Sequence, residues 1–306
     1  MITVYNTHGI TWVNLEKPSR DEVLGMQERY GIHPIVLNEL LEPSLRTKVD
    51  LYPGYAYMIF RFPMLISNSI IHGTEEREID FIIGKNFLIT THYESIEPLY
   101  TMRKFLEAGT MLNKEKSIEH AGFLLYALLR RMYQATEDEL IHLQSHIKKT
   151  EALIFEGHER KMVEEISKLN RVLINFWWCT RTHAELLDSF KIVAKSFWGE
   201  SFHYYLQSLS GEFSKVDKAI NGHREVVKGL QSTNDSLLTA KTDQTMKVLT
   251  MPATIIFAIS AIGAIFSMNV KNTPLVDDPN AFWIILGVMF LISVGSMAYF
   301  WYKRWI

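Results

Sequence analysis

The sequence predicts an α+β membrane protein. An N-terminal mixed α/β domain is followed by long coiled-coil-like helices and by a stalk helix that continues into the first of two C-terminal transmembrane helices. Three features lead to this expectation. Strand-like runs and helix starts alternate near the N-terminus, apolar residues then recur three and four positions apart, and two long stretches near the C-terminus lack charge.

The first region, residues 1–116, is expected to form a cytoplasmic α/β domain. Runs of β-branched and aromatic residues predict strands, and Gly84 and Asn86 mark a tight hairpin between two of them. Ser19 is the expected N-cap of a helix, because acidic residues follow it in the first turn. The expected strands cover residues 1–5, 10–15, 55–65, 79–83 and 86–92.

Residues 117–200 are expected to form paired cytoplasmic helices. A coiled-coil-like seam runs along the first of them, and a turn at residues 156–158 precedes a second helical stretch over residues 159–197. After a break at residues 198–200, a cytoplasmic stalk helix is expected over residues 201–247. The seam consists of Leu129, Met132, Thr136, Leu140, Leu143, Ile147, Thr150 and Ile154.

The two uncharged stretches predict a membrane hairpin. Each reaches roughly 34 Å as a helix at about 1.5 Å per residue, which exceeds the ~30 Å hydrocarbon core of a bilayer. We expect transmembrane helices at residues 248–270 and 281–302, an extracytoplasmic loop at residues 271–280 and a cytoplasmic tail at residues 303–306.

Basic residues indicate the orientation of this hairpin. Lys241 and Lys247 precede the first span and Lys303 follows the second, whereas the loop carries two adjacent aspartates. The positive-inside rule therefore predicts that both termini are cytoplasmic. We expect a multi-pass protein of the plasma (inner) membrane.

Composition and motifs exclude several classes of protein. The formal net charge of −2 argues against a nucleic-acid binder, and the single cysteine, Cys179, excludes an internal disulfide and a cysteine-rich metal site. No glycine-rich phosphate loop, serine nucleophile elbow or HExxH motif occurs, so an enzyme is not expected. Glu139, His142 and His146 have a spacing that can bind zinc, but a solvated coiled-coil face is the favoured interpretation.

Two membrane helices cannot enclose a pore, so any transport requires an oligomer in which each subunit contributes one lining helix. The first span is the expected lining because hydroxyl and small residues share one of its faces, although ordinary helix packing would explain them too. A ring of Phe257 would form a dry constriction that gates by dewetting. The expected pore-lining residues are Asp243, Met246, Thr250, Ala253, Phe257, Ser260 and Ala264, on one face with Ser267.

Short motifs along the whole chain resemble the CorA family of divalent-cation (magnesium) transporters and channels. At the end of the first span, Ser267, Met268 and Asn269 stand where that family has Gly-Met-Asn. The motifs that carry the resemblance lie at residues 12–15, 33–34, 38–43, 46–50, 84–90, 246–250 and 266–270.

The resemblance implies a homopentamer in the lipid bilayer, with a funnel-shaped cytoplasmic domain and an axial stalk helix that continues into the pore. Ser267, Met268 and Asn269 would form the outer mouth and select the ion. An amide ring at Asn269 suits outer-shell contact with hydrated Mg²⁺, because this ion gives up its water reluctantly. No cofactor is implied besides the transported cation.

The chain also departs from the family pattern. The asparagine ring at the cytoplasmic end of the family's pore matches Asp243, which would add a carboxylate ring and a second metal contact. The acidic residue of the family's loop is missing, and Asp277 and Asp278 would attract cations in its place. A regulatory carboxylate of the family matches Ser208, with Glu212 one turn later.

We therefore expect transport of divalent cations, with Mg²⁺ as the main ion and Co²⁺ and Ni²⁺ as further permeant ions. No nucleic acid and no small organic substrate is expected as a partner. Two alternatives remain open: a zinc transporter of the same superfamily, and a non-conducting membrane-anchored sensor or scaffold with the same fold. Neither span contains His or Cys, the ligands that Zn²⁺ prefers, so zinc would pass hydrated.

The expected orientation predicts which positions are accessible from outside the cell. In an Asn272→Cys variant, the introduced thiol should react with a membrane-impermeant reagent in intact cells. In a Ser232→Cys variant it should react only after permeabilisation. The reverse labelling pattern would contradict the topology.

Overall fold

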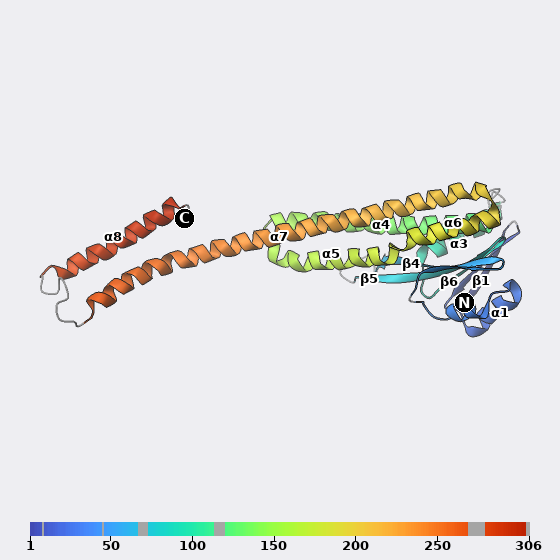
Figure 1. Cartoon of the computed structure of the whole chain (residues 1–306), viewed down its shortest axis with the longest axis horizontal. Helices are drawn as coiled ribbons and strands as arrows, with labels where there is room; N and C mark the ends of the chain where they lie inside the picture. The colour runs from blue at the N-terminus through green and yellow to red at the C-terminus, as the bar shows by residue number, and fades with distance from the viewer. Residues whose placement is uncertain (8, 45, 67–72, 113–119, 269–278, 304–306) are drawn as a thin grey trace. The chain divides into compact units, whose positions relative to one another are not determined.

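The computed structural model describes residues 1–7, 9–44, 46–66, 73–112, 120–268 and 279–303. The chain divides into two compact units, residues 1–232 and residues 233–306. The first contains a six-stranded sheet with helices packed on it (Figure 1). The second contains the C-terminal part of α7 (His203–Phe266) and the helix α8 (Ala281–Tyr302).

The sheet has the strand order β1-β2-β6-β5-β4-β3. β2 pairs with β6 in parallel, and each of the other neighbouring pairs is antiparallel. The predicted hairpin is present, since β5 and β6 are joined by two residues. The strands are β1 (Ile2–Thr7), β2 (Ile10–Glu16), β3 (Lys48–Tyr52), β4 (Tyr55–Leu65), β5 (Thr74–Gly84) and β6 (Phe87–His92).

Two short helices, α1 (Arg20–Tyr30) and α2 (Pro34–Glu39), share a hydrophobic core with one face of the sheet. Ser19 caps α1 as predicted: its Oγ accepts from the Glu22 amide at 3.3 Å, and the Glu22 carboxylate accepts from the Ser19 amide at 2.8 Å. The core consists of Val13, Leu15, Val23, Met26, Ile32, Val36, Leu37, Leu40, Tyr55, Tyr57, Ile59, Ile82 and Ile89.

Longer helices pack on the other face of the sheet. They are α4 (Ala121–Phe155), α5 (Glu159–Thr180) and α6 (His183–Trp198), with α3 (Glu97–Leu112) beside α4. All eight residues of the predicted seam on α4 are buried. The fold class predicted from the sequence is therefore confirmed, although β3, α2 and α3 were not predicted.

The helical stretch expected over residues 159–197 forms two helices, because the chain breaks between α5 and α6 at Arg181 and Thr182. The break allows His183 to enter the core. Its Nε2 lies 2.9 Å from the Arg61 carbonyl oxygen and its Nδ1 lies 3.2 Å from the Tyr133 hydroxyl. The imidazole thus links α6 to β4 and α4, and these distant contacts override the local helical pattern.

The helix α7 follows a short 3₁₀ turn (Glu200–Phe202) and continues for 64 residues to Phe266. Its first half belongs to the first unit, where it packs on α4. His223 Nε2 lies 3.2 Å from the Leu140 carbonyl oxygen. The buried residues on this part of α7 recur at helical spacing and are Leu206, Leu209, Val216, Ile220, Val227 and Leu230.

Substitution of His183 should destabilise the first unit. His183→Ala removes a fully buried ring and leaves the Tyr133 hydroxyl and Arg61 carbonyl without this partner, so we expect a loss of about 3 kcal/mol in unfolding free energy. His203→Ala, at an exposed position, should change it by less than about 0.5 kcal/mol. Thermal unfolding of the full-length protein in detergent measures both.

The same residue predicts a pH dependence. Burial lowers the pKa of His183 to about 3, whereas an unfolded histidine titrates near ~6.5. The unfolded chain therefore binds this proton more tightly, and the stabilisation is present above pH ~6.5 and lost as the pH falls toward 3. His183→Ala should flatten this part of the stability profile. An unchanged profile would show that other groups cause the loss.

Candidate functional site

Within the part of the chain that the structure describes, two helices are long and apolar enough to cross a membrane, α7 and α8. Only 6% of the apolar window on α7 and 0% of that on α8 is buried within the chain. Such surfaces are unstable in water, so bilayer lipid or other subunits must cover them.

The predicted pore-lining stripe lies on one exposed face of α7. Phe257 is 76% exposed and Met246 is 56% exposed. The other members are exposed too, namely Asp243, Thr250, Ala253, Ser260, Ala264 and Ser267. The structure thus leaves the whole stripe available to a partner or an aqueous path.

A different face of α7 is turned toward α8. A Cβ atom on Gly263 would lie 3.5 Å from the Met289 Cε atom, so the two helices approach closely there. The half-buried residues on this face are Ile255, Ile259, Ile262 and Phe266. Because residues two apart on a helix are about 200° apart, Phe257 lies nearly opposite Ile259. The stripe therefore faces away from α8.

The threonine hydroxyls on α7 have a fixed direction of donation. Thr250 Oγ1 donates to the Met246 carbonyl oxygen at 2.7 Å, and Thr254 Oγ1 donates to the Thr250 carbonyl oxygen at 2.8 Å. Each proton is thereby used within the helix, which leaves the oxygen lone pairs as acceptors. Oxygen acceptors on an uncharged surface suit the water shell of a cation.

The helix α7 ends at the predicted mouth. The Ser267 amide donates to the Gly263 carbonyl at 2.9 Å, and the Met268 amide donates to the Ile265 carbonyl at 3.3 Å. Ser267 and Met268 are both exposed at this end. The carboxyl end of a helix carries partial negative charge, which favours a cation, and this backbone contribution has no signal in the residue types. Asn269, Asp277 and Asp278 lie outside the described residues.

Ser208 and Glu212, which the sequence resemblance compares with a regulatory carboxylate, both contact other residues of the chain. The Ser208 hydroxyl lies 3.3 Å from the Tyr126 hydroxyl. Glu212 pairs with Lys215 at 2.9 Å and with Arg130 at 3.8 Å. Two cationic partners already neutralise Glu212, so a metal ion would have to displace them.

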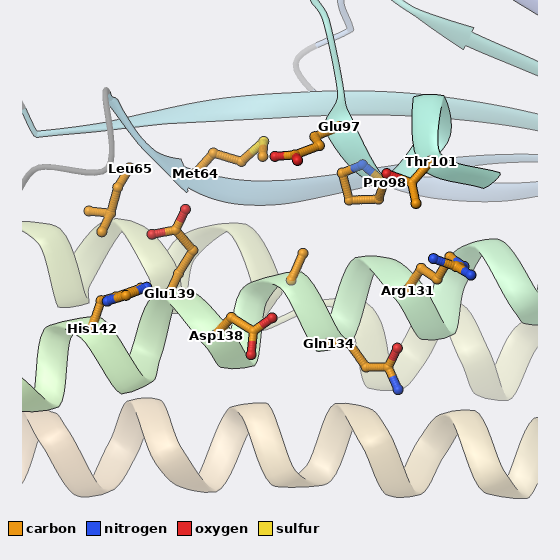
Figure 2. Close-up of a pocket in the computed structure, with 11 residues that line it drawn as sticks. Met64, Leu65, Glu97, Pro98, Thr101, Arg131, Gln134, Asp138, Glu139 and His142 are labelled. Atoms are coloured by element: carbon orange, nitrogen blue, oxygen red, sulfur yellow. The ribbon is translucent and has the colours of Figure 1, made fainter. Parts of the chain in front are cut away.

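A separate pocket of about 370 Å³ lies in the first unit, between the end of β4, the start of α3 and one face of α4 (Figure 2). Glu139 extends toward Leu65 in this view, beside His142. Burial raises the pKa of the Glu139 carboxyl. His146 does not line the pocket. Among the described residues no three His, Cys, Asp or Glu side chains are placed to hold a metal ion, so the zinc-like spacing gains no support.

Comparison with known proteins adds independent information. The family described as "CorA-like Mg2+ transporter protein" matches residues 7–304 of the chain. The cobalt/magnesium transport protein CorA of Thermotoga maritima is 25% identical over 298 residues, which cover 97% of this chain and 83% of that protein.

Two solved structures are similar in fold. The complete CorA magnesium transporter from Methanocaldococcus jannaschii aligns with a TM-score of 0.84 at 22% identity, over 99% of this chain and 93% of that one. The cytoplasmic domain of ZntB from Vibrio parahaemolyticus aligns with a TM-score of 0.56 at 12% identity, over 76% of this chain and 90% of that one.

Proposed function

Because the chain belongs to the CorA-like Mg2+ transporter family, a family of divalent-cation transporters and not of enzymes, we propose that it conducts hydrated Mg²⁺ through a homopentameric pore. Co²⁺ and Ni²⁺ are further permeant ions in this proposal. The protein lies in the plasma (inner) membrane with both termini in the cytoplasm.

One observation carries the proposal: the stripe on α7 is exposed, faces away from α8 and is free of charge from Val248 to Met268. A lipid-facing surface would favour larger apolar side chains, whereas this face alternates hydroxyl, small and aromatic residues. Symmetric copies of α7 around an axis would cover the stripe and enclose a path for ions.

The path begins at the outer mouth, where Asn269 follows the carboxyl end of α7. The partial negative charge of the helix end attracts a cation, and a neutral amide oxygen can bind the water shell without trapping the ion. Asp277 and Asp278 act at longer range, since charges are screened over about 8 Å at physiological salt. They raise the local cation concentration more than they select the ion.

Farther along the pore, Thr250 offers an oxygen acceptor to the water shell and Phe257 narrows the path with an apolar ring. Asp243 would form a carboxylate ring at the cytoplasmic end. Like charges in a ring repel, so this ring would favour a bound divalent cation. Along the path from Asp243 to Asn269 the ion can keep its own water ligands, which suits Mg²⁺.

Zinc is the second candidate ion. Its preferred ligands, His and Cys, are missing from both spans. A hydrated zinc ion could still follow the same path. A non-conducting sensor or scaffold would transport neither ion.

Asn269→Ala should reduce divalent-cation flux by at least about tenfold, because one lost charge–dipole contact per subunit weakens capture of the hydrated ion. The measurement is uptake of Mg²⁺ and, in parallel, Zn²⁺ into liposomes that contain the purified protein. Oligomer size should stay unchanged.

Ser293→Ala is the matched control. The Ser293 hydroxyl donates to the Met289 carbonyl oxygen at 2.8 Å within α8, away from the stripe, so flux should remain near the wild-type value. Normal Mg²⁺ flux through Asn269→Ala would show that the mouth does not work as proposed. Zinc uptake in the wild type without Mg²⁺ uptake would favour the zinc transporter, and uptake of neither ion would favour the scaffold.

A further inference from the structure

A buried carboxyl group lies within the sheet, far along the chain from the membrane helices. Asp80 on β5 is 1% exposed. It lies two residues before Ile82, so both side chains face the side of the sheet that α1 and α2 cover. Its neighbour across the ladder on β6 is Thr91. Among the described residues, neither Asp80 Oδ1 nor the buried Thr91 hydroxyl has a hydrogen-bond partner.

The other carboxyl oxygen contacts two phenol hydroxyls. Asp80 Oδ2 lies 3.4 Å from the Tyr57 hydroxyl and 3.3 Å from the Tyr93 hydroxyl. Both contacts are longer than the usual O–H···O hydrogen bond of about 2.5–3.0 Å, so they offset little of the cost of burying a charged carboxylate. No Lys or Arg in the described part of the chain forms an ion pair with Asp80.

The electrostatic surroundings favour the neutral carboxyl group. Burial raises the pKa of the Asp80 carboxyl well above its usual value, and the Glu78 carboxylate raises it further, against the two phenol hydrogen bonds. Titratable or charged residues surround it from each neighbouring element: Glu39 and Glu42 at and after α2, Lys48 and Asp50 on β3, Tyr57 and Arg61 on β4, Glu78 on β5 and Tyr93 after β6.

The Tyr93 hydroxyl has one proton and three oxygen neighbours. It lies 3.0 Å from the Glu42 carbonyl oxygen, 3.3 Å from the Glu39 carbonyl oxygen and 3.3 Å from Asp80 Oδ2. A phenol donates one strong hydrogen bond and accepts others. If Asp80 carries a proton, it can donate to Tyr93 while Tyr93 donates to Glu42, and the chain of hydrogen bonds is complete.

Tyr93 thereby holds residues 39–44, which connect α2 toward β3. The far end of this segment is held at a second point. The Ser44 amide donates to Glu78 Oε1 at 2.7 Å, and the Arg61 guanidinium donates to the Ser44 carbonyl oxygen. The segment depends on two anchors that both neighbour Asp80.

We propose that Asp80 is a proton-binding site that keeps residues 39–44 docked on the sheet through the Tyr93 hydroxyl. When Asp80 releases its proton to solvent, the carboxylate competes for the Tyr93 proton. The charge-assisted bond is the stronger one, so the Glu42 carbonyl loses its donor and this end of the segment loosens. Tyr93 stays protonated throughout.

The sign of the pH effect follows from linkage. In the docked state Asp80 binds its proton more tightly than in the released state, where it titrates near ~3.9. Docking is therefore most stable below pH ~4 and weakens as the pH rises. Its stability levels off above the raised pKa of Asp80. Within this window the population of the released state grows by up to about tenfold per pH unit.

Hydrogen exchange of the full-length protein between pH 5 and 8, corrected for intrinsic exchange rates, tests the proposal. In the wild type, opening of residues 39–44 should rise by up to about tenfold per pH unit. In Asp80→Asn, a neutral isostere of the protonated acid, it should change by less than about twofold across the range. Asp188→Asn, at an exposed site on α6, should keep the wild-type slope.

Two results would overturn the proposal: a wild-type slope that persists in Asp80→Asn, or wild-type opening that does not change with pH. Tyr93→Phe supplies a second test that does not depend on the folding of Asp80→Asn. It should leave residues 39–44 poorly protected at every pH and abolish the slope. A Tyr93→Phe variant with wild-type protection would show that the hydroxyl does not hold the segment.

Discussion

The constraint that shapes this protein is the exposed apolar surface of α7 and α8. Almost none of it is buried within the chain, and no soluble monomer can leave so much apolar surface in water. A bilayer covers α8 and the outer faces, but the stripe from Thr250 to Ser267 carries hydroxyl groups that lipid would not favour. In the proposed oligomer, a second copy of the same helix would cover this surface.

The first unit holds the first half of α7 in place. This half of the helix packs on α4, where His223 Nε2 lies 3.2 Å from the Leu140 carbonyl oxygen. His183 links α6, β4 and α4 in one buried network, and its neutral state at physiological pH costs no desolvated charge. The proposed proton site at Asp80 adds a titratable contact on the opposite side of the same sheet.

Some of this organisation could be predicted from the sequence, because it depends on local pattern. The Ser19 cap and the seam on α4 follow from residue type and spacing. The break before His183 could not be predicted, because its cause is contact with Arg61 and Tyr133, far away in the sequence. The burial of Asp80 could not be predicted, because Glu76, Glu78 and Asp80 lie two apart in a strand and acidic residues on one strand face are typical of a solvent-facing surface. The mouth residues are predicted from family resemblance, because residue spacing alone does not identify them.

The most direct test of the central claim is disulfide cross-linking between subunits in membranes, in a Cys179→Ala background. If the stripe faces other copies of α7, Phe257→Cys should form covalent dimers under mild oxidation, because thiols on facing helices come within bonding distance. Leu291→Cys, which is 73% exposed on α8, should stay monomeric. Cross-linking at Leu291 but not at Phe257 would contradict the account and would place α8 at the subunit interface.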